Sequence, residues 1–216
     1  MNLIRRYRKH IIFILMLILI AGLMECVMTI YYDKLVQESL SVGRLFSLRP
    51  VYNKSGSWYH ARLGIGYRQG LLIAENIAAL LIVWLAYRFL EAWGWFFGMR
   101  SFWLYLLDFV IAATLYRLFH SVLGLYTLDY IRIVSRRSTN TFDFPDFYLG
   151  ISAVAILAWF IFALIPYYKY KHNQVKGMRL LPKFVWEIRL TVLFIKVVFV
   201  PKERWAELFE RAGHGR

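Results

Sequence analysis

Two aspartates, Asp129 and Asp146, flank a short polar stretch between two apolar segments of the sequence. If those segments fold as neighbouring helices, both carboxyl groups lie at the same end of a helix bundle. Two carboxyl groups at close range cannot both ionise easily, so one keeps its proton near neutral pH. Such a pair can hydrolyse a peptide bond without a metal ion, because the ionised group activates water while the protonated group hydrogen-bonds the carbonyl oxygen. Asp129 and Asp146 are therefore candidate catalytic residues.

Each of these aspartates also has a structural explanation. Pro145 and Asp146 stand at the start of an apolar segment, where an aspartate commonly caps the N-terminus of a helix. Asp129 would be a solvated loop charge if it faces the arginines that follow it, namely Arg132, Arg136 and Arg137. Spacing alone leaves the catalytic and the structural explanations open.

Further polar residues lie within or near the ends of the apolar segments, where an ionisable group is costly and often functional. Arg117 and His120 are three residues apart, so a helix places them on one face, near the stretch that holds Asp129. We expect both side chains to line the site. Three others are equally well explained by hydrogen bonds between packed helices: Glu75, Asn76 and Asp108.

The composition requires a lipid environment. Of the 216 residues, 60% are hydrophobic and 19% are aromatic, which exceeds the share that a soluble domain buries. The excess of 27 Lys and Arg over 13 Asp and Glu suits anionic phospholipid or nucleic acid, and the hydropathy favours phospholipid and excludes nucleic acid. One cysteine, Cys26, and no clustered Cys and His pattern give no basis for a metal site or another cofactor.

Four apolar segments are long enough to cross a bilayer, which takes about 20 helical residues. They are residues 11–30, 71–90, 102–123 and 147–165. Basic residues crowd the first ten positions and follow the fourth segment, so the positive-inside rule places both termini in the cytoplasm. The first segment lacks the cleavage site of a signal peptide, and we expect it to remain as a span. The two long connections are then extracytoplasmic and have room for a small β-element.

The last part of the chain differs from these four segments. Residues 184–200 are apolar but include Glu187, Arg189 and Lys196, which a membrane-spanning helix would bury at high cost. An amphipathic helix at the membrane interface is the better interpretation, followed by a second short helix. The sequence thus predicts an all-α membrane protein with a four-span domain, residues 1–168, and a basic cytoplasmic tail, residues 169–216.

Four short sequence patterns occur in the predicted four-span domain. Tyr-Asp-Lys-Leu-Val-Gln stands at 32–37, and Asn53 and Gly56 in the first outer connection are followed by an aromatic residue. The third pattern joins residues 116–121 to Thr-Leu-Asp-Tyr at 127–130, and the fourth is Phe-Asp-Phe-Pro-Asp at 142–146. In order and spacing these patterns resemble the motifs of bacterial lipoprotein signal peptidase, also called signal peptidase II.

This resemblance covers residues 10–168 and implies a membrane aspartyl endopeptidase of the bacterial cytoplasmic membrane. Its substrate would be a prolipoprotein, cleaved just before a cysteine that carries a diacylglyceryl group. The resemblance implies that Asp129 and Asp146 form the catalytic pair. It also implies that three residues line the substrate groove: Asn53, Gly56 and Asp143.

The chain departs from the family pattern around this pair. Arg117 and His120 stand where the family has Asn and Asp, Ser121 stands where it has Arg, and Asp143 where it has Asn. A third carboxylate beside the pair can raise the pKa values of the pair, and Arg117 can offset that charge. The departures are therefore consistent with a compensating set or with an altered activity.

Two other functions fit the sequence. One is a non-catalytic membrane protein that binds lipid or a lipoprotein for assembly, with Asp146 as a helix cap and the basic tail on anionic headgroups. The other is a small transporter that uses Glu75, Asp108 and His120 as a proton relay, although the chain has neither repeats nor spans broken by Gly or Pro. The separation of the two carboxyl groups distinguishes catalysis from the first alternative.

Overall fold

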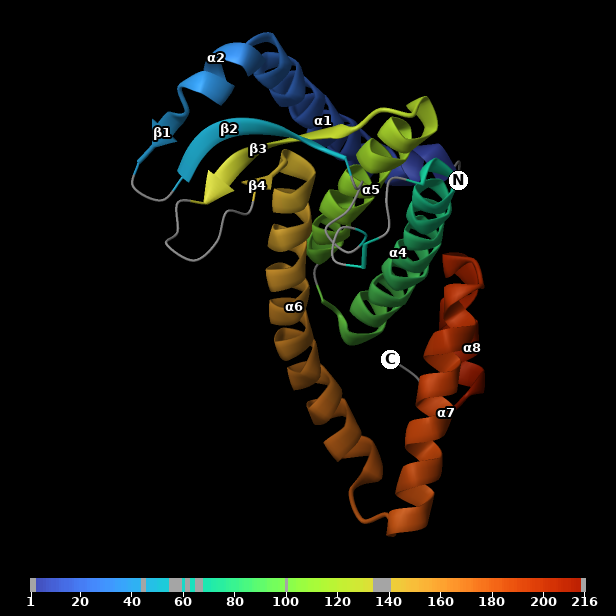
Figure 1. Cartoon of the computed structure of the whole chain (residues 1–216). Helices are drawn as coiled ribbons and strands as arrows, with labels where there is room; N and C mark the ends of the chain where they lie inside the picture. Colours follow the sequence, from blue (N-terminus) through green and yellow to red (C-terminus); the bar gives the residue numbers. More distant parts are fainter. Residues whose placement is uncertain are drawn as a thin grey trace. The chain divides into compact units, whose positions relative to one another are not determined.

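The structure is a computed structural model that describes residues 3–43, 46–54, 60, 63–64, 68–99, 101–133 and 141–214. It is mostly helical, with one small antiparallel sheet (Figure 1). Four of the described helices are long and apolar enough to cross a membrane, with spans at Tyr7–Ile30, Gln69–Phe97, Tyr105–Leu123 and Phe144–Val175. The fold class predicted from the sequence is confirmed, and the protein is a multi-pass membrane protein.

The four spanning helices are α1 (Leu3–Ile30), α4 (Gln69–Phe97), α5 (Tyr105–Leu123) and α6 (Phe144–Val175). A short 3-10 helix, η1 (Ser101–Leu104), precedes α5, so this span begins slightly later than predicted. Helix α6 continues through Pro166 beyond the predicted end at residue 165. The extension is held because Tyr167 and Tyr170 pack against an aromatic cluster that is described below.

The contacts divide the chain into two compact units that cut across the helices. The first unit comprises Met1–Leu80 and Asp108–Ser152, and the second comprises Leu81–Leu107 and Ala153–Arg216. Each unit therefore combines segments that are far apart in the sequence. The predicted boundary at residue 168 follows the resemblance rather than these contacts, and it stays a prediction.

In the first unit, the described parts of the two long connections contain the small β-element that the sequence allowed. Its strands are antiparallel and follow the order β1 (Leu40–Val42), β2 (Phe46–Asn53), β3 (Thr127–Ile133) and β4 (Thr141–Phe142). A short helix, α2 (Tyr32–Gln37), links α1 to this sheet. Leu128 and Tyr130 alternate with more exposed residues along β3 and pack against Met28, which fixes the face of β3 that carries Asp129.

The helices of the first unit pack through small and aromatic side chains. Ala112 and Ala113 of α5 are fully buried in a cluster with Leu17 and Ala21 of α1 and Tyr148 of α6, because small residues let helices approach closely. His10 Nδ1 lies 2.7 Å from Asp108 Oδ2 and joins the same pair of helices, α1 and α5. Asp108 thus has the helix-to-helix role that the sequence offered as one of its two explanations.

In the second unit, the tail forms α7 (Leu180–Val198), a short 3-10 helix η2 (Lys202–Arg204) and α8 (Trp205–Arg211). Pro182 lies in the first turn of α7, where its missing N–H group costs no helical hydrogen bond. The tail packs onto the end of α4 through a cluster of buried residues: Ala92, Phe96, Leu190, Leu193, Phe194, Val197, Trp205 and Phe209. Both predicted tail helices are present, and their place at the membrane interface stays a prediction.

Candidate functional site

Helix α6 begins with a pair of reciprocal hydrogen bonds between Asp143 and Asp146. The backbone N–H of Asp146 donates to Asp143 Oδ1 at 2.7 Å, and the N–H of Asp143 donates to Asp146 Oδ2 at 3.4 Å. This is a capping box, in which the N-cap residue and the third helical residue satisfy free N–H groups for each other. The cap of this helix is therefore Asp143, and the expectation that Asp146 caps it is wrong.

Asp129 lies on β3, and the sheet positions it next to Asn53. Val51 of β2 is opposite Asp129 and Asn53 is opposite Thr127, so Asn53 and Asp129 are diagonal neighbours on one face of the sheet. Asn53 Nδ2 donates to Asp129 Oδ2 at 3.3 Å. Asp129 is thus a partly buried, hydrogen-bonded strand residue and not the solvated loop charge that the sequence also allowed.

Arg117 of α5 contacts the aspartates near the start of α6. We call the group formed by Asp129, Asp143 and Asp146 the carboxylate site. Its guanidinium group donates to Asp146 and lies 3.9 Å from Asp143 Oδ1. One carboxylate oxygen from each of Asp129, Asp143 and Asp146 lies within 4.8 Å of one from each of the other two. The structure therefore brings together both predicted catalytic aspartates and, around them, Asn53, Arg117 and Asp143.

Burial and repulsion favour the protonated form of two of these aspartates, Asp129 and Asp143. Burial and the neighbouring charges of Asp143 and Asp146 raise the pKa of Asp129 to about 8, although Arg117 and the hydrogen bond from Asn53 act in the opposite direction. Burial, followed by the charge of Asp146, also raises the pKa of Asp143, which is 4% exposed. At neutral pH Asp129 thus keeps its proton, beside the Asp146 side chain that pairs with Arg117.

His120 has a different partner from Arg117. Its Nε2 lies 2.9 Å from Glu25 Oε2, and its Nδ1 lies 3.1 Å from the carbonyl oxygen of Tyr116. The Tyr116 hydroxyl donates to the same Glu25 carboxylate. These contacts join α1 to α5. Among the described contacts, none links the His120 side chain to the three aspartates.

Arg117 and His120 nevertheless line one cavity, as their spacing predicted. The cavity has a volume of about 250 Å³, and Thr127 and Leu149 border it close in sequence to Asp129 and Asp146. The polar residues of α4 that border the same cavity are Glu75 and Asn76. A substrate side chain that enters this cavity would thus lie beside the carboxylate site.

Two further residues near this site were not assigned a role from the sequence. His60, which is 1% exposed, places its Nε2 2.8 Å from Glu75 Oε1. The Tyr130 hydroxyl accepts a hydrogen bond of 3.3 Å from the backbone N–H of Phe144 and so completes the first turn of α6. The alternation of Leu128 and Tyr130 with the polar residues Thr127 and Asp129 was a sequence signal for Tyr130, whereas the sequence around His60 carries no such pattern. Gly56, the remaining predicted groove residue, lies outside the described residues.

Three clustered carboxylates are also a geometry that can hold a cation. In this site, however, Arg117 already supplies a positive charge to Asp146 and Asp143. The donor set therefore suits acid–base chemistry by paired carboxyl groups, with an arginine in place of a metal ion.

Comparison with known proteins gives little further identification. No family model matches the sequence, and no curated protein matches it significantly. Three chains among the solved structures match. One is described as "Bacterial membrane enzyme structure by the in meso method at 2.3 A resolution"; it is 15% identical, with a TM-score of 0.47 over 79% of this chain and 93% of that chain. A likeness at this level is no argument for a shared activity.

Proposed function

We propose that the protein is a membrane aspartyl endopeptidase that removes signal peptides from diacylglyceryl-modified prolipoproteins. The observation that carries this proposal is the approach of Asp129 and Asp146, whose carboxylate oxygens lie within 4.8 Å. One water molecule fits between carboxyl groups at such a distance, and peptide hydrolysis by an aspartyl pair requires that arrangement. The same proposal places the protein in the bacterial cytoplasmic membrane, with both termini in the cytoplasm.

The two aspartates take different roles because their surroundings differ. Asp146, paired with Arg117, is the carboxylate that removes a proton from the attacking water. Asp129, whose pKa is raised to about 8, is protonated at neutral pH and donates a hydrogen bond to the scissile carbonyl oxygen. Water oxygen then bonds to the carbonyl carbon, and the proton held by Asp146 passes to the leaving nitrogen as the C–N bond breaks.

Asp143 and Arg117 act through this pair. Asp143 fixes the first turn of α6 by the capping box and so orients Asp146. Its negative charge also favours the proton on Asp129, while Arg117 limits the repulsion among the three carboxylates. The departures from the family pattern at these two positions thus compensate each other. Asn53 orients Asp129 and borders the path of the substrate.

A non-catalytic role explains only part of this geometry. A capping box accounts for Asp143 and Asp146 without any reaction. It does not account for the placement of Asp129 beside them, since repulsion and burial of a third carboxyl group destabilise the fold. The catalytic proposal explains why all three lie together.

The test is cleavage of a diacylated prolipoprotein by the purified protein in detergent micelles. Asp129→Asn and Asp146→Asn should each lower kcat/KM by about a thousandfold, because each removes one half of an acid–base pair. Glu38→Gln, at an exposed position just after α2, is the matched control and should cleave like wild type. Added EDTA should leave the rate unchanged.

The outcome that contradicts the proposal is equally clear. If both dyad variants cleave as well as wild type, the catalytic assignment of Asp129 and Asp146 is wrong. A melting temperature within a few degrees of wild type for each variant shows that any loss of activity is not a loss of folding.

A further inference from the structure

The second unit contains an open groove whose walls are entirely apolar. It has a volume of about 440 Å³ and is bordered by Leu85 and Leu90 of α4, Ile156 and Phe160 of α6, and Ile195 of α7. Phe199, the residue that follows α7, also borders it. We call it the apolar groove. Phe199 is 68% exposed, so the groove opens sideways to whatever surrounds the helices. In a membrane protein that surrounding medium is the hydrocarbon of lipid chains.

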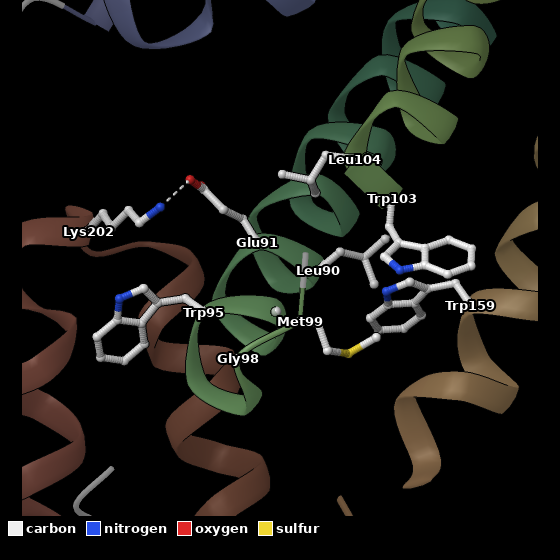
Figure 2. Close-up of a pocket in the computed structure, with 10 residues that line it drawn as sticks. Leu90, Glu91, Trp95, Gly98, Met99, Trp103, Leu104, Trp159 and Lys202 are labelled. Carbon is white, nitrogen blue, oxygen red and sulfur yellow. Dashed lines mark hydrogen bonds and ion pairs between the residues drawn. The ribbon is translucent and has the colours of Figure 1, made fainter. Parts of the chain in front are cut away.

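A second cavity, of about 290 Å³, shares Leu90 with this groove. Figure 2 shows that the cavity has two unlike sides: the indole rings of Trp103 and Trp159 lie together near Leu90, while Glu91 and Lys202 form an ion pair on the other side. The apolar groove therefore borders, at Leu90, a cavity that has aromatic and charged walls. This order of surfaces matches a lipid, in which an acyl chain leads to a polar headgroup.

The charged residues of the cavity, Glu91 and Lys202, belong with Arg88 to a group that has an excess of positive charge. Glu91, which is 7% exposed, lies 3.0 Å from Arg88 Nη1 and 3.2 Å from Lys202 Nζ. Arg88 also donates to the carbonyl oxygens of Val198 and Val200, at 3.2 and 2.5 Å, which holds it at the end of α7. Two cations share one carboxylate, so this group, which we call the Glu91 cluster, is complementary to one further negative charge.

We propose that these two neighbouring cavities bind an anionic phospholipid, with one acyl chain in the apolar groove and the phosphate at Lys202. The groove offers no polar side chain, so it suits a hydrocarbon chain and not a peptide or a soluble metabolite. The net positive charge favours an anionic lipid over a zwitterionic one. The bound lipid joins the tail helix α7 to the spanning helices α4 and α6, a role that is independent of peptide cleavage.

The experiment is native mass spectrometry of the full-length protein after removal of endogenous lipid. The protein is titrated with phosphatidylglycerol or with phosphatidylcholine of the same acyl chains. One phosphatidylglycerol per chain should be retained, at about tenfold lower dissociation constant than phosphatidylcholine, which corresponds to one charge-assisted contact. Equal retention of the two lipids would overturn the assignment of the headgroup site.

Variants separate the two ends of the site. Ala86→Trp fills the apolar groove and should abolish retention of both lipids, whereas Ala153→Trp, at an exposed position of α6, should leave retention unchanged. Lys202→Gln should weaken phosphatidylglycerol about tenfold, and Lys202→Arg should preserve it. Melting temperatures identify any variant that fails to fold.

Three results would overturn the proposal. The first is unchanged binding in Ala86→Trp, which would show that the lipid lies elsewhere. The second is displacement of phosphatidylglycerol by an equimolar diacylated substrate peptide, which would assign the groove to substrate. The third is a dimer mass that replaces the lipid-bound monomer, which would assign the groove to a second copy of the chain. None of these results bears on cleavage by Asp129 and Asp146.

Discussion

Two groups of charged side chains in this protein have opposite charge balances. In the carboxylate site, three aspartates share one arginine, Arg117. In the Glu91 cluster, one carboxylate is shared by two cations, Arg88 and Lys202. The carboxylate site has too few cations to balance its carboxylates, whereas the Glu91 cluster has a surplus.

This difference indicates which group can do proton chemistry. Two neighbouring cations stabilise the charged form of a buried carboxylate. Such a group contributes to structure and to the binding of anions. Carboxyl groups that lack enough cations retain protons near neutral pH, as Asp129 does with its pKa of about 8. A site that holds both a protonated carboxyl group and a carboxylate can donate and accept protons within one reaction.

The largest expected effect comes from removing one carboxylate from each group. Glu91→Gln leaves Arg88 and Lys202 without their shared counter-ion and should lower the free energy of unfolding by about 3 kcal/mol. Asp143→Asn removes a charge from a site where carboxylates repel, and asparagine still caps a helix, so stability should be unchanged or higher. Chemical or thermal unfolding in detergent measures both. Equal losses of stability in the two variants would contradict the distinction between the groups.

The pH dependence of cleavage should reflect the carboxylate site. Because Asp129 must be protonated and its pKa is raised to about 8, kcat/KM should fall as the pH rises through about 8. The contribution of Asp129 to stability has the same sign. Its folded pKa lies above the unfolded value of about 4, so this contribution is fully present below pH 4 and is lost as the pH rises from there to about 8. A rate profile from pH 5 to 10 tests this, with Glu38→Gln as the control. A rate that stays flat to pH 10 would remove Asp129 from the role of acid.

The fall of kcat/KM at high pH is the alkaline limb of the rate profile. Two variants should shift this limb in opposite directions. Asp143→Asn removes a negative charge that raises the pKa of Asp129, so the limb should shift to lower pH by about one unit. Arg117→Gln removes a positive charge that lowers the same pKa, so the limb should shift to higher pH by a similar amount, although the lower activity will require more enzyme. Shifts in the same direction would show that the limb belongs to another group.

Much of the fold followed from hydropathy, because about 20 consecutive apolar residues leave few options other than a spanning helix. The four spans and the two tail helices were predicted in this way. The approach of Asp129 to Asp146 was expected from folding the third and fourth spans side by side. The strands of the sheet and their pairing were not predicted. β2 and β3 are separated by two spans in the sequence, and their pairing depends on contacts that local patterns do not reveal. That pairing is what brings Asn53 to Asp129.

The partners of the polar span residues could not be predicted from spacing. Arg117 and His120 share a helical face, but each side chain turns toward a different carboxylate on a neighbouring helix. His120 pairs with Glu25 of α1, and Arg117 pairs with Asp146 of α6. The proton relay of Glu75, Asp108 and His120 is likewise not assembled, since each has a separate partner in His60, His10 and Glu25. Ion-pair geometry in a helix bundle depends on neighbouring helices and not on one segment.

The smallest expected effect separates the two roles of Asp143, as a charge and as a helix cap. Asp143→Ala removes both and should lower the free energy of unfolding by about 1 kcal/mol relative to Asp143→Asn, which retains the cap through its side-chain oxygen. The two variants lose the same charge, so both should move the alkaline limb of the rate profile alike, and only stability and the orientation of Asp146 should differ between them. If alanine and asparagine give the same stability, the capping box does not hold the first turn of α6, and the orientation of Asp146 then depends on Arg117 alone.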